Sequence, residues 1–188
     1  MSALAAQVKI PISIDTDKAV VARRAMGAGA SIINDVSALR NDPDMKAAAL
    51  LAQGIIIMHM RGTPKTMQAV PRYENVVEEV KEFFLERERE FVQAGGESSR
   101  LLIDPGIGFG KNLGHNLSLL KHLGSLAGLG RPLVVGISRK SFLGRIMAGQ
   151  RSGQADRNAV NLPGPEERLE GSLAAACQVG RIGNIPLS

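Results

Sequence analysis

Leu101-Leu102-Ile103-Asp104-Pro105-Gly106-Ile107-Gly108-Phe109-Gly110-Lys111 is the stretch that decides the fold. Its first three residues are apolar, as in a strand buried on both faces, and they end in the carboxylate of Asp104. Pro105 and the glycines that follow disfavour both helix and strand. An acid at the carboxyl end of a buried strand, before a loop that can approach a ligand closely, is typical of sites in parallel α/β proteins. Asp104 is therefore a candidate site residue; the alternative is that it caps the next turn.

The same order, an apolar run followed by a polar end, recurs along the chain. About five strands are expected, because parallel α/β proteins repeat this unit, and their carboxyl ends fall at Asp15, Asn34, Met58 with His59, Asp104, and Arg139 with Lys140. Helical patterns follow the strands and cover about residues 17–28, 42–53, 74–94, 116–126, 141–148 and 166–179. Strands that alternate with helices require a parallel sheet.

The even alternation predicts an α/β fold of the (β/α) barrel type. A closed barrel needs eight strands and usually about 250 residues, whereas this chain has 188 residues. We therefore expect a partial (β/α)8 TIM barrel of about five parallel strands alternating with helices. An open doubly wound sheet is the alternative. Residues 1–188 are expected to form a single domain.

Composition limits the class of protein. Hydrophobic residues make up 44% of the chain, which indicates a globular protein. The net charge of +5 mildly favours anionic ligands, but no basic block suggests a nucleic-acid partner. Cys177 is the single cysteine, as expected in a reducing compartment. Without a signal-like start or a long apolar run, we expect a soluble cytoplasmic protein with no membrane partner.

Polar side chains at the strand ends should share one rim of the sheet. In a parallel sheet Asp15, Asn34, Asp104 and Lys140 would converge on one mouth. Asp and Asn offer planar acceptors and donors that suit a flat heterocycle with an amidine-like edge. Lys adds a point charge for a carbonyl, a ring nitrogen or an anion. Helix capping by Asp15 and Asn34, and a solvated Lys140, are the structural alternatives.

Three other features carry weaker signals. His59 has no partner at metal-ligand spacing, since the other histidines are His115 and His122, so a packing or positioning role is favoured. The glycines of 106–110 resemble a phosphate-binding loop only superficially, because neither the Walker A nor the dinucleotide spacing is present. Cys177 has no local partner and is expected in the core.

Several motifs together resemble the dihydropteroate synthase family. The similarity covers about residues 8–176, and the Met-His-Met-Arg-Gly-Thr-Pro loop distinguishes this family from the wider pterin-binding methyltransferases. The motifs are Ile12–Thr16, Ile33–Val36, Met58–Gln68, Leu102–Lys111 and Ser138–Ser141.

This resemblance implies an enzyme, an alkyl-group transferase of folate biosynthesis. The family is a TIM barrel that condenses 6-hydroxymethyl-7,8-dihydropterin diphosphate with 4-aminobenzoate, giving 7,8-dihydropteroate and diphosphate. Sulfonamides would compete for the aminobenzoate place. By resemblance, the pterin and aminobenzoate would contact Asp15, Asn34, Met58, Asp104, Gly108, Phe109, Arg139, Lys140 and Ser141, with Lys140 and Asp104 as the catalytic residues.

Within that set the resemblance implies separate roles. Asp15, Asn34 and Asp104 would hold the edge of the pterin ring, which Lys140 would also contact. The pocket walls would come from Met58 and Phe109, whereas Arg139 and Ser141 would lie near the aminobenzoate carboxylate.

The sequence also departs from the family pattern. By resemblance, Ile12 corresponds to the third strand of the family barrel. The family's Asn-containing loop, which binds magnesium and diphosphate, and its Ser-Thr-Arg-Pro-Gly loop then have no counterpart here. The tail 180–188 does not resemble the family's Arg-x-His motif. Mg²⁺ is thus implied as a cofactor only through the family, no metal ligand is assigned in this chain, and weak or absent catalysis is expected.

Two alternatives stay open at this point. One is a non-catalytic pterin-binding module, and the other is a pterin-dependent methyltransferase relative that carries methyltetrahydrofolate. The loop 63–68 argues against the second. A five-strand sector would leave bare sheet edges, which predicts self-association, and the resemblance leaves a homodimer open.

Overall fold

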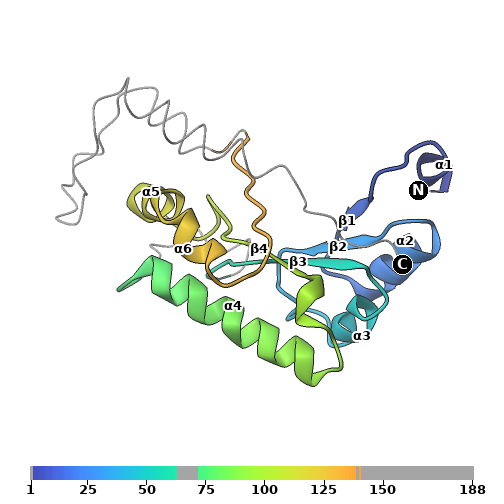
Figure 1. Cartoon of the computed structure of the whole chain (residues 1–188), viewed down its shortest axis with the longest axis horizontal. Helices are drawn as coiled ribbons and strands as arrows, with labels where there is room; N and C mark the ends of the chain where they lie inside the picture. Colours follow the sequence, from blue (N-terminus) through green and yellow to red (C-terminus); the bar gives the residue numbers. More distant parts are fainter. Residues whose placement is uncertain (1, 63–71, 139, 141–188) are drawn as a thin grey trace.

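The structure is a computed structural model that describes residues 2–62, 72–138 and 140. Strands and helices alternate along the chain, as the sequence predicts (Figure 1). The elements are α1 (Ser2–Ala5), β1 (Ser13–Asp15), α2 (Ala19–Gly27), β2 (Ile32–Asp35), α3 (Met45–Ala49), β3 (Gly54–Met58), α4 (Val76–Gln93), the 3₁₀ turn η1 (Ser98–Arg100), β4 (Leu101–Asp104), α5 (Leu113–Lys121) and α6 (Leu123–Ala127).

The sheet has four strands in the order β1-β2-β3-β4, and all neighbouring strands are parallel. Sequential strands are thus spatial neighbours, joined by helical crossovers, as in a (β/α) barrel. Because all four strands run the same way, their carboxyl ends lie along one edge of the sheet. The α/β class with a parallel sheet is confirmed, and within the described residues the barrel is open.

The expected fifth strand, at about residues 132–137, is present only as its beginning. Leu133 forms an isolated parallel bridge with Ile103. The N–H of Ile103 donates to Pro132 O at 3.0 Å, and the N–H of Val134 donates to Ile103 O at 2.9 Å. Pro132 has no N–H to extend the ladder, and Gly136 weakens a strand interior. Within the residues that the structure describes, the prediction of about five strands is therefore corrected to four strands and one bridge.

Helix α3 is shorter than the expected helix at 42–53. The Asp42 carboxylate accepts from the N–H of Asp44 at 3.0 Å and from the N–H of Ala19 at 2.8 Å. Asp42 therefore holds a turn before α3 and also binds a free N–H at the start of α2. The helical pattern from residue 42 therefore begins too early, because residues before Met45 form a turn whose Asp42 carboxylate also serves the neighbouring helix.

The helix expected at 116–126 is two helices that start earlier. Asn112 and His115 form a capping box, in which Asn112 Oδ1 accepts from the N–H of His115 at 2.8 Å. This cap places the start of α5 at Leu113, earlier than the pattern predicts. The helix is interrupted at His122, which separates α5 from α6. The helices expected at 141–148 and 166–179, and Cys177, lie outside the described residues.

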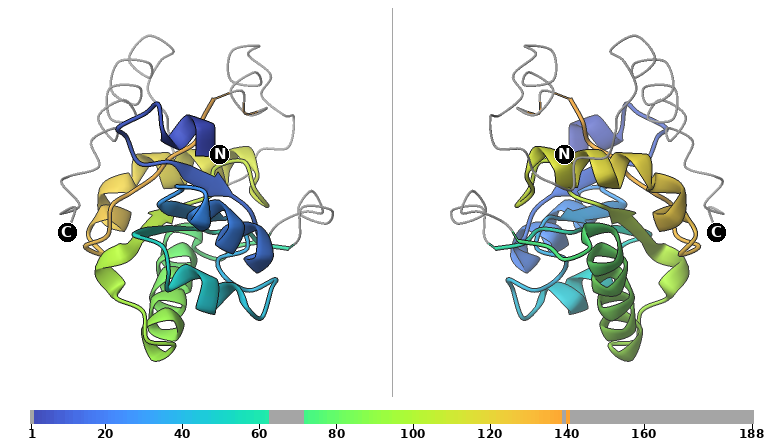
Figure 2. Two further views of the ribbon diagram at one scale, coloured as in Figure 1. Left: turned by 90° about the vertical axis from the view of Figure 1, so that its right-hand side faces the viewer. Right: turned by 90° about the vertical axis from the view of Figure 1, so that its left-hand side faces the viewer.

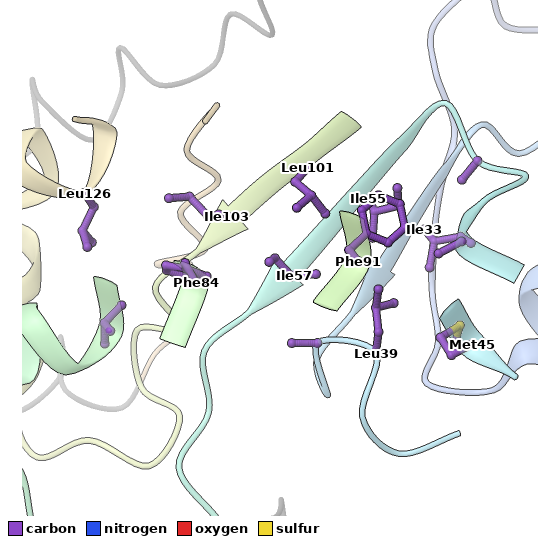
Figure 3. Packing of buried hydrophobic residues seen from close by; sticks show 14 of the residues in the cluster. Ile33, Leu39, Met45, Ile55, Ile57, Phe84, Phe91, Leu101, Ile103 and Leu126 are labelled. Carbon is purple, nitrogen blue, oxygen red and sulfur yellow. The ribbon is translucent and has the colours of Figure 1, made fainter. Parts of the chain in front are cut away.

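One face of the sheet packs against the helices. Figure 3 shows the side chains of this face beside Phe84 and Phe91 of α4. Figure 1 shows α4 running beside the strands, and Figure 2 shows this green helix on one side of the sheet. Phe84 and Phe91 of α4 are 2% and 1% exposed. The strand residues of this core are Ile33, Ile55, Ile57, Leu101 and Ile103. Burial of five branched side chains and two aromatic rings makes this the main stabilising layer.

The opposite face carries a smaller apolar cluster and the candidate site. Ile32, Ile56 and Leu102 pack together here with Val134. Side chains alternate between the two faces of a strand, so the residues two positions after these three also point to this face. Those residues are Asn34, Met58 and Asp104. In β2, β3 and β4 the alternation thus turns one face to the core and places Asn34, Met58 and Asp104 on the other.

Within the described ranges, no helix is both long and apolar enough to cross a membrane.

Candidate functional site

The strand register brings the predicted site residues together at the carboxyl edge. Asp15 lies opposite Asn34 in the β1–β2 pair, and Met58 lies opposite Asp104 in the β3–β4 pair. Partners in register point to the same face. Four of the predicted residues therefore lie on one face and at one edge of the sheet.

Lys140 and the loop after β4 complete this group. Lys140 Nζ lies 3.9 Å from the centre of the Phe109 ring, which is a cation–π contact. A Cβ atom added at Gly108 would lie 3.2 Å from Lys140 Cδ. The aliphatic part of Lys140 thus runs over Gly108, and its ammonium group sits above Phe109. We place the centre of the candidate site between this ammonium and the carboxylate of Asp104.

Asp104 and Lys140 influence each other electrostatically. Burial raises the pKa of Asp104 above its usual value, whereas the N–H of Gly106, which donates to Asp104 Oδ1 at 2.7 Å, and the charge of Lys140 oppose that shift. Burial likewise lowers the pKa of Lys140, and Asp104 opposes it. Each charge makes the other less costly to bury, so the site presents one acceptor and one donor close together.

Part of the predicted site cannot be placed. Arg139 and Ser141 lie outside the described residues, as do residues 63–68 of the family-specific loop. Their predicted contacts with an aminobenzoate carboxylate remain predictions.

Lys111 is a residue whose role the sequence analysis missed. Its Nζ donates to three backbone carbonyls, those of His59 at 3.1 Å, Gly106 at 3.0 Å and Phe109 at 3.0 Å. Burial lowers the pKa of Lys111 to about 7, and the charge of Asp104 opposes the shift. A lysine directly after a glycine-rich loop was visible in the sequence. The convergence of carbonyls from two segments was not.

The glycines of this loop serve close backbone packing. Gly106, Gly108 and Gly110 all have positive φ angles, 65°, 83° and 60°. A Cβ atom at Gly106 would lie 1.9 Å from His59 O. The N–H of Gly106 is bound by Asp104 and that of Gly108 by Asn116 Oδ1 at 2.7 Å. Amides that already have protein partners are not free to cradle a phosphate, which accords with the weak loop signal.

His59 is a buried, neutral positioning residue. It is 6% exposed, and its ring packs edge-on against Phe83 with centroids 4.9 Å apart. Nδ1 lies 3.0 Å from Lys111 Nζ. Burial first, and then the charges of Lys111 and Arg40, lower the pKa of His59 to about 2. The imidazole therefore stays uncharged and can accept from Lys111.

Asp35 follows Asn34 but points to the other face. It is fully buried, and its carboxylate accepts from the N–H groups of Ser37 at 2.7 Å and Leu39 at 2.9 Å. Ala38 and Leu39 have φ angles of 53° and 62°, which non-glycine residues rarely adopt. Asp35 thus holds a strained turn beneath the site, while Asn34 is left to face it.

A separate groove adjoins the end of β3. It measures about 560 Å³ and is lined by Arg40 from the loop after β2, by residues of α4 such as Phe83, and by His59, Arg61 and Tyr73 from the segments on either side of residues 63–71. Arg61 stacks on the Tyr73 ring at 4.6 Å. The four strand-end residues of the candidate site are not part of this groove, so it lies next to the site and not in it.

The comparisons with known proteins agree with this arrangement. Residues 1–183 match the family described as pterin binding enzyme. The dihydropteroate synthase of Escherichia coli K12 is 43% identical over 176 residues, which is 94% of this chain and 57% of that protein. The Mycobacterium leprae dihydropteroate synthase is 45% identical over 150 residues, 78% of this chain and 52% of the relative. The chain thus spans little more than half the length of these curated relatives.

Solved structures give the same result. A Yersinia pestis dihydropteroate synthase in a sulfonamide drug complex superposes with a TM-score of 0.76 at 39% identity, over 93% of this chain and 59% of that one. A Xanthomonas albilineans dihydropteroate synthase in complex with 7,8-dihydropteroate gives 0.74 at 38% identity, over 95% and 58%.

The fold and the rim of acceptors around Asp104 define a sector of a parallel α/β barrel with a candidate ligand site at its carboxyl edge. The chain belongs to the pterin-binding enzymes, and the resemblance of its motifs to the dihydropteroate synthases is confirmed. A methyltransferase relative and a non-catalytic module are not favoured by these relatives.

Proposed function

We propose that this chain supplies the pterin-binding part of a dihydropteroate synthase. In the proposed reaction the amino nitrogen of 4-aminobenzoate attacks the methylene carbon of 6-hydroxymethyl-7,8-dihydropterin diphosphate. A C–N bond forms, the C–O bond breaks, and its electron pair leaves on diphosphate while the nitrogen releases a proton. The family and the convergence of Asp15, Asn34 and Asp104 on one edge support this proposal.

The proposed roles follow from the chemistry of each group. Asp15, Asn34 and Asp104 would accept from and donate to the amidine-like edge of the pterin. The Lys140 ammonium would contact a ring nitrogen or carbonyl, with Asp104 and Lys140 as the residues closest to catalysis. The reaction needs placement and charge stabilisation more than an acid–base pair, and a buried carboxylate beside an ammonium suits that need.

The proposed site also has pocket walls and a group that binds the second substrate. Met58, Gly108 and Phe109 would line the ligand pocket. The charged and polar groups of Arg139 and Ser141, which lie outside the described residues, would bind the aminobenzoate carboxylate.

Magnesium is implied by the family but does not fit the residues in view. In the described part of the chain, no group of three His, Cys, Asp or Glu side chains lies close enough to hold a metal ion. Diphosphate binding, a cytoplasmic location and a homodimer also remain proposals, the location resting on the single cysteine.

A pterin titration tests the proposed site. Fluorescence titration with 6-hydroxymethylpterin should give saturable binding to the 188-residue chain. Asp104→Asn keeps the shape and the bond from Gly106 but removes the charge. It should weaken binding by about 10–100-fold, the worth of one charge-assisted hydrogen bond. Asp44→Asn is the matched control, because the Asp44 side chain is 75% exposed and lies at the start of α3, outside the set of strand-end residues.

The two pterin affinities show whether the ligand binds at Asp104. Equal affinities for the wild type and Asp104→Asn would show that the pterin binds elsewhere, and absence of binding by the wild type would overturn the proposal. A coupled assay of diphosphate release then measures turnover, which we expect to be weak for this chain alone. Near-normal turnover would contradict that expectation.

A further inference from the structure

The ammonium group of Lys111 is enclosed by acceptors from two separate segments. His59 O belongs to the segment after β3, and the carbonyls of Gly106 and Phe109 belong to the loop after β4. His59 Nδ1, at 3.0 Å, is a fourth acceptor. An ammonium has three N–H donors, so all of its donor capacity is used within the protein. Lys111 has no N–H left for a ligand.

Without a cation these segments would repel each other. Three carbonyl oxygens carry partial negative charge, and each lies about 3 Å from one nitrogen atom. The backbones also touch, since a Cβ atom at Gly106 would lie 1.9 Å from His59 O. A positive donor at the centre converts this repulsion into charge-assisted hydrogen bonds. Lys111 therefore fixes the distance between the end of β3 and the loop.

The same loop carries the candidate pterin site. Gly106 N–H donates to Asp104 Oδ1 at 2.7 Å, and the Phe109 ring lies below Lys140 Nζ at 3.9 Å. Lys111 holds the carbonyl groups of both Gly106 and Phe109. A shift of this backbone would therefore move the Asp104 carboxylate and the aromatic ring together.

We infer that Lys111 is a positioning residue: its ammonium group ties the loop 106–109 to the end of β3 and so holds Asp104 and Phe109 in the geometry that the pterin site requires. This inference rests on the proposed function for the identity of the ligand. The expected effect of Lys111 on the loop is independent of the proposed function, because it can be measured without any ligand.

The test with ligand uses charge removal and chemical rescue. Lys111→Met keeps the apolar stem but removes the donors, and should weaken 6-hydroxymethylpterin binding by about tenfold to a hundredfold, because a displacement near 1 Å at a site has that effect. Lys121→Met, at the exposed end of α5, is the control and should bind as the wild type does. Circular dichroism checks that each variant is folded.

Restoring pterin affinity with an added cation distinguishes two roles of Lys111: positioning of the loop by its N–H donors, or packing by its side chain. Lys111→Ala leaves a space that n-propylammonium can enter, and this cation should restore pterin affinity. Tetramethylammonium carries the same charge but no N–H donor, and should not. Equal rescue by both cations, or by neither, would overturn the role given to the N–H donors.

Hydrogen exchange tests the loop alone. In Lys111→Met the amides of Gly106, Gly108 and Phe109 should exchange faster than in the wild type, while those of α4 stay protected. Unchanged loop protection, or a loss of protection throughout the chain, would each overturn the inference. If the wild type failed to bind pterin but the loop amides responded as expected, the proposed function would fail and the loop anchor would stand.

Discussion

His59 shows how much of the site depends on one uncharged ring. The imidazole is buried against Phe83 and lies beside the Lys111 ammonium, so a proton on it would face a positive charge in an apolar setting. Its pKa is therefore lowered from 6.5 to about 2. Asp104 and Lys140 have the opposite relation, since each favours the charge of the other. Burial thus lowers the pKa of His59 with the help of a neighbouring charge, whereas the mutual charges of Asp104 and Lys140 oppose the pKa shifts that burial causes in each.

The pH dependence of stability should report on His59. Between pH about 6.5 and about 2 the unfolded chain binds a proton at this residue and the folded chain does not, so stability falls as the pH falls, by up to about 1.4 kcal/mol per unit. His59→Asn keeps an acceptor for Lys111 but cannot be protonated. Urea unfolding between pH about 6.5 and about 5 should show the wild type losing about 2 kcal/mol more than this variant. Parallel curves would contradict the assignment.

Single residues differed in how well sequence could place them. Asp15, Asn34 and Asp104 were predicted because each ends an apolar run, and position in a strand is local information. The anchor at Lys111 and the turn held by Asp35 were not predicted, since their partners come from other loops or from backbone atoms. Strand ends are visible in a sequence, whereas convergence of carbonyl groups is not.

The glycine-rich loop after β4 is the element on which the site depends most. Its backbone touches two neighbouring segments, with Gly106 against His59 O and Gly110 against Arg61 O, where an added Cβ atom would lie at 1.9 Å and 2.5 Å. Tyr73 Oη also donates to Gly110 O at 3.0 Å. The loop is thus held at the carboxyl edge of the sheet by contacts with His59, Arg61 and Tyr73.

Replacing Gly106 should disturb this loop. Gly106→Ala adds a Cβ atom into the His59 carbonyl and places alanine at a φ of 65°. We expect a loss of more than about 2 kcal/mol in urea unfolding, together with weaker pterin binding. Gly124→Ala is the control, because a Cβ atom at Gly124 in α6 meets nothing within 4 Å. It should gain up to about 1 kcal/mol. Equal stability of the two variants would contradict the close packing.

The ends of elements were predicted less well than their existence. Helix α3 is shortened because Asp42 binds the N–H of Ala19 in another helix, and α5 starts early because of its capping box. The fifth strand reaches only a bridge at Leu133. Only the boundary of α3 involves a contact from outside its element, which a local pattern does not record. The capping box of α5 and the Pro132 and Gly136 of the fifth strand are local features, which apolar periodicity alone does not weigh.

At the scale of the whole molecule, the alternation of strands and helices was enough to predict a parallel barrel sector. The pairing of β1 and β2 that brings Asp15 beside Asn34 follows from the barrel order, in which sequential strands are neighbours.

Self-association is expected from the edges of this sector. In the described residues β1 pairs only with β2, and an unpaired strand edge is a template for another chain. Ile10, just before β1, and Leu51 are 72% and 65% exposed. Sedimentation velocity should show association that rises with concentration and is reduced in Ile10→Lys. A monodisperse monomer at every concentration would contradict this expectation.

The most direct test of the pterin site is methyl NMR of the chain labelled at methionine. Met58 lies opposite Asp104 on the site face, whereas Met45, which is fully buried, lies in the core beneath the other face. Addition of 6-hydroxymethylpterin should shift the Met58 methyl signal saturably and leave the Met45 signal in place. A Met58 signal that does not move, or a Met45 signal that shifts equally, would contradict a pterin site at this edge of the sheet.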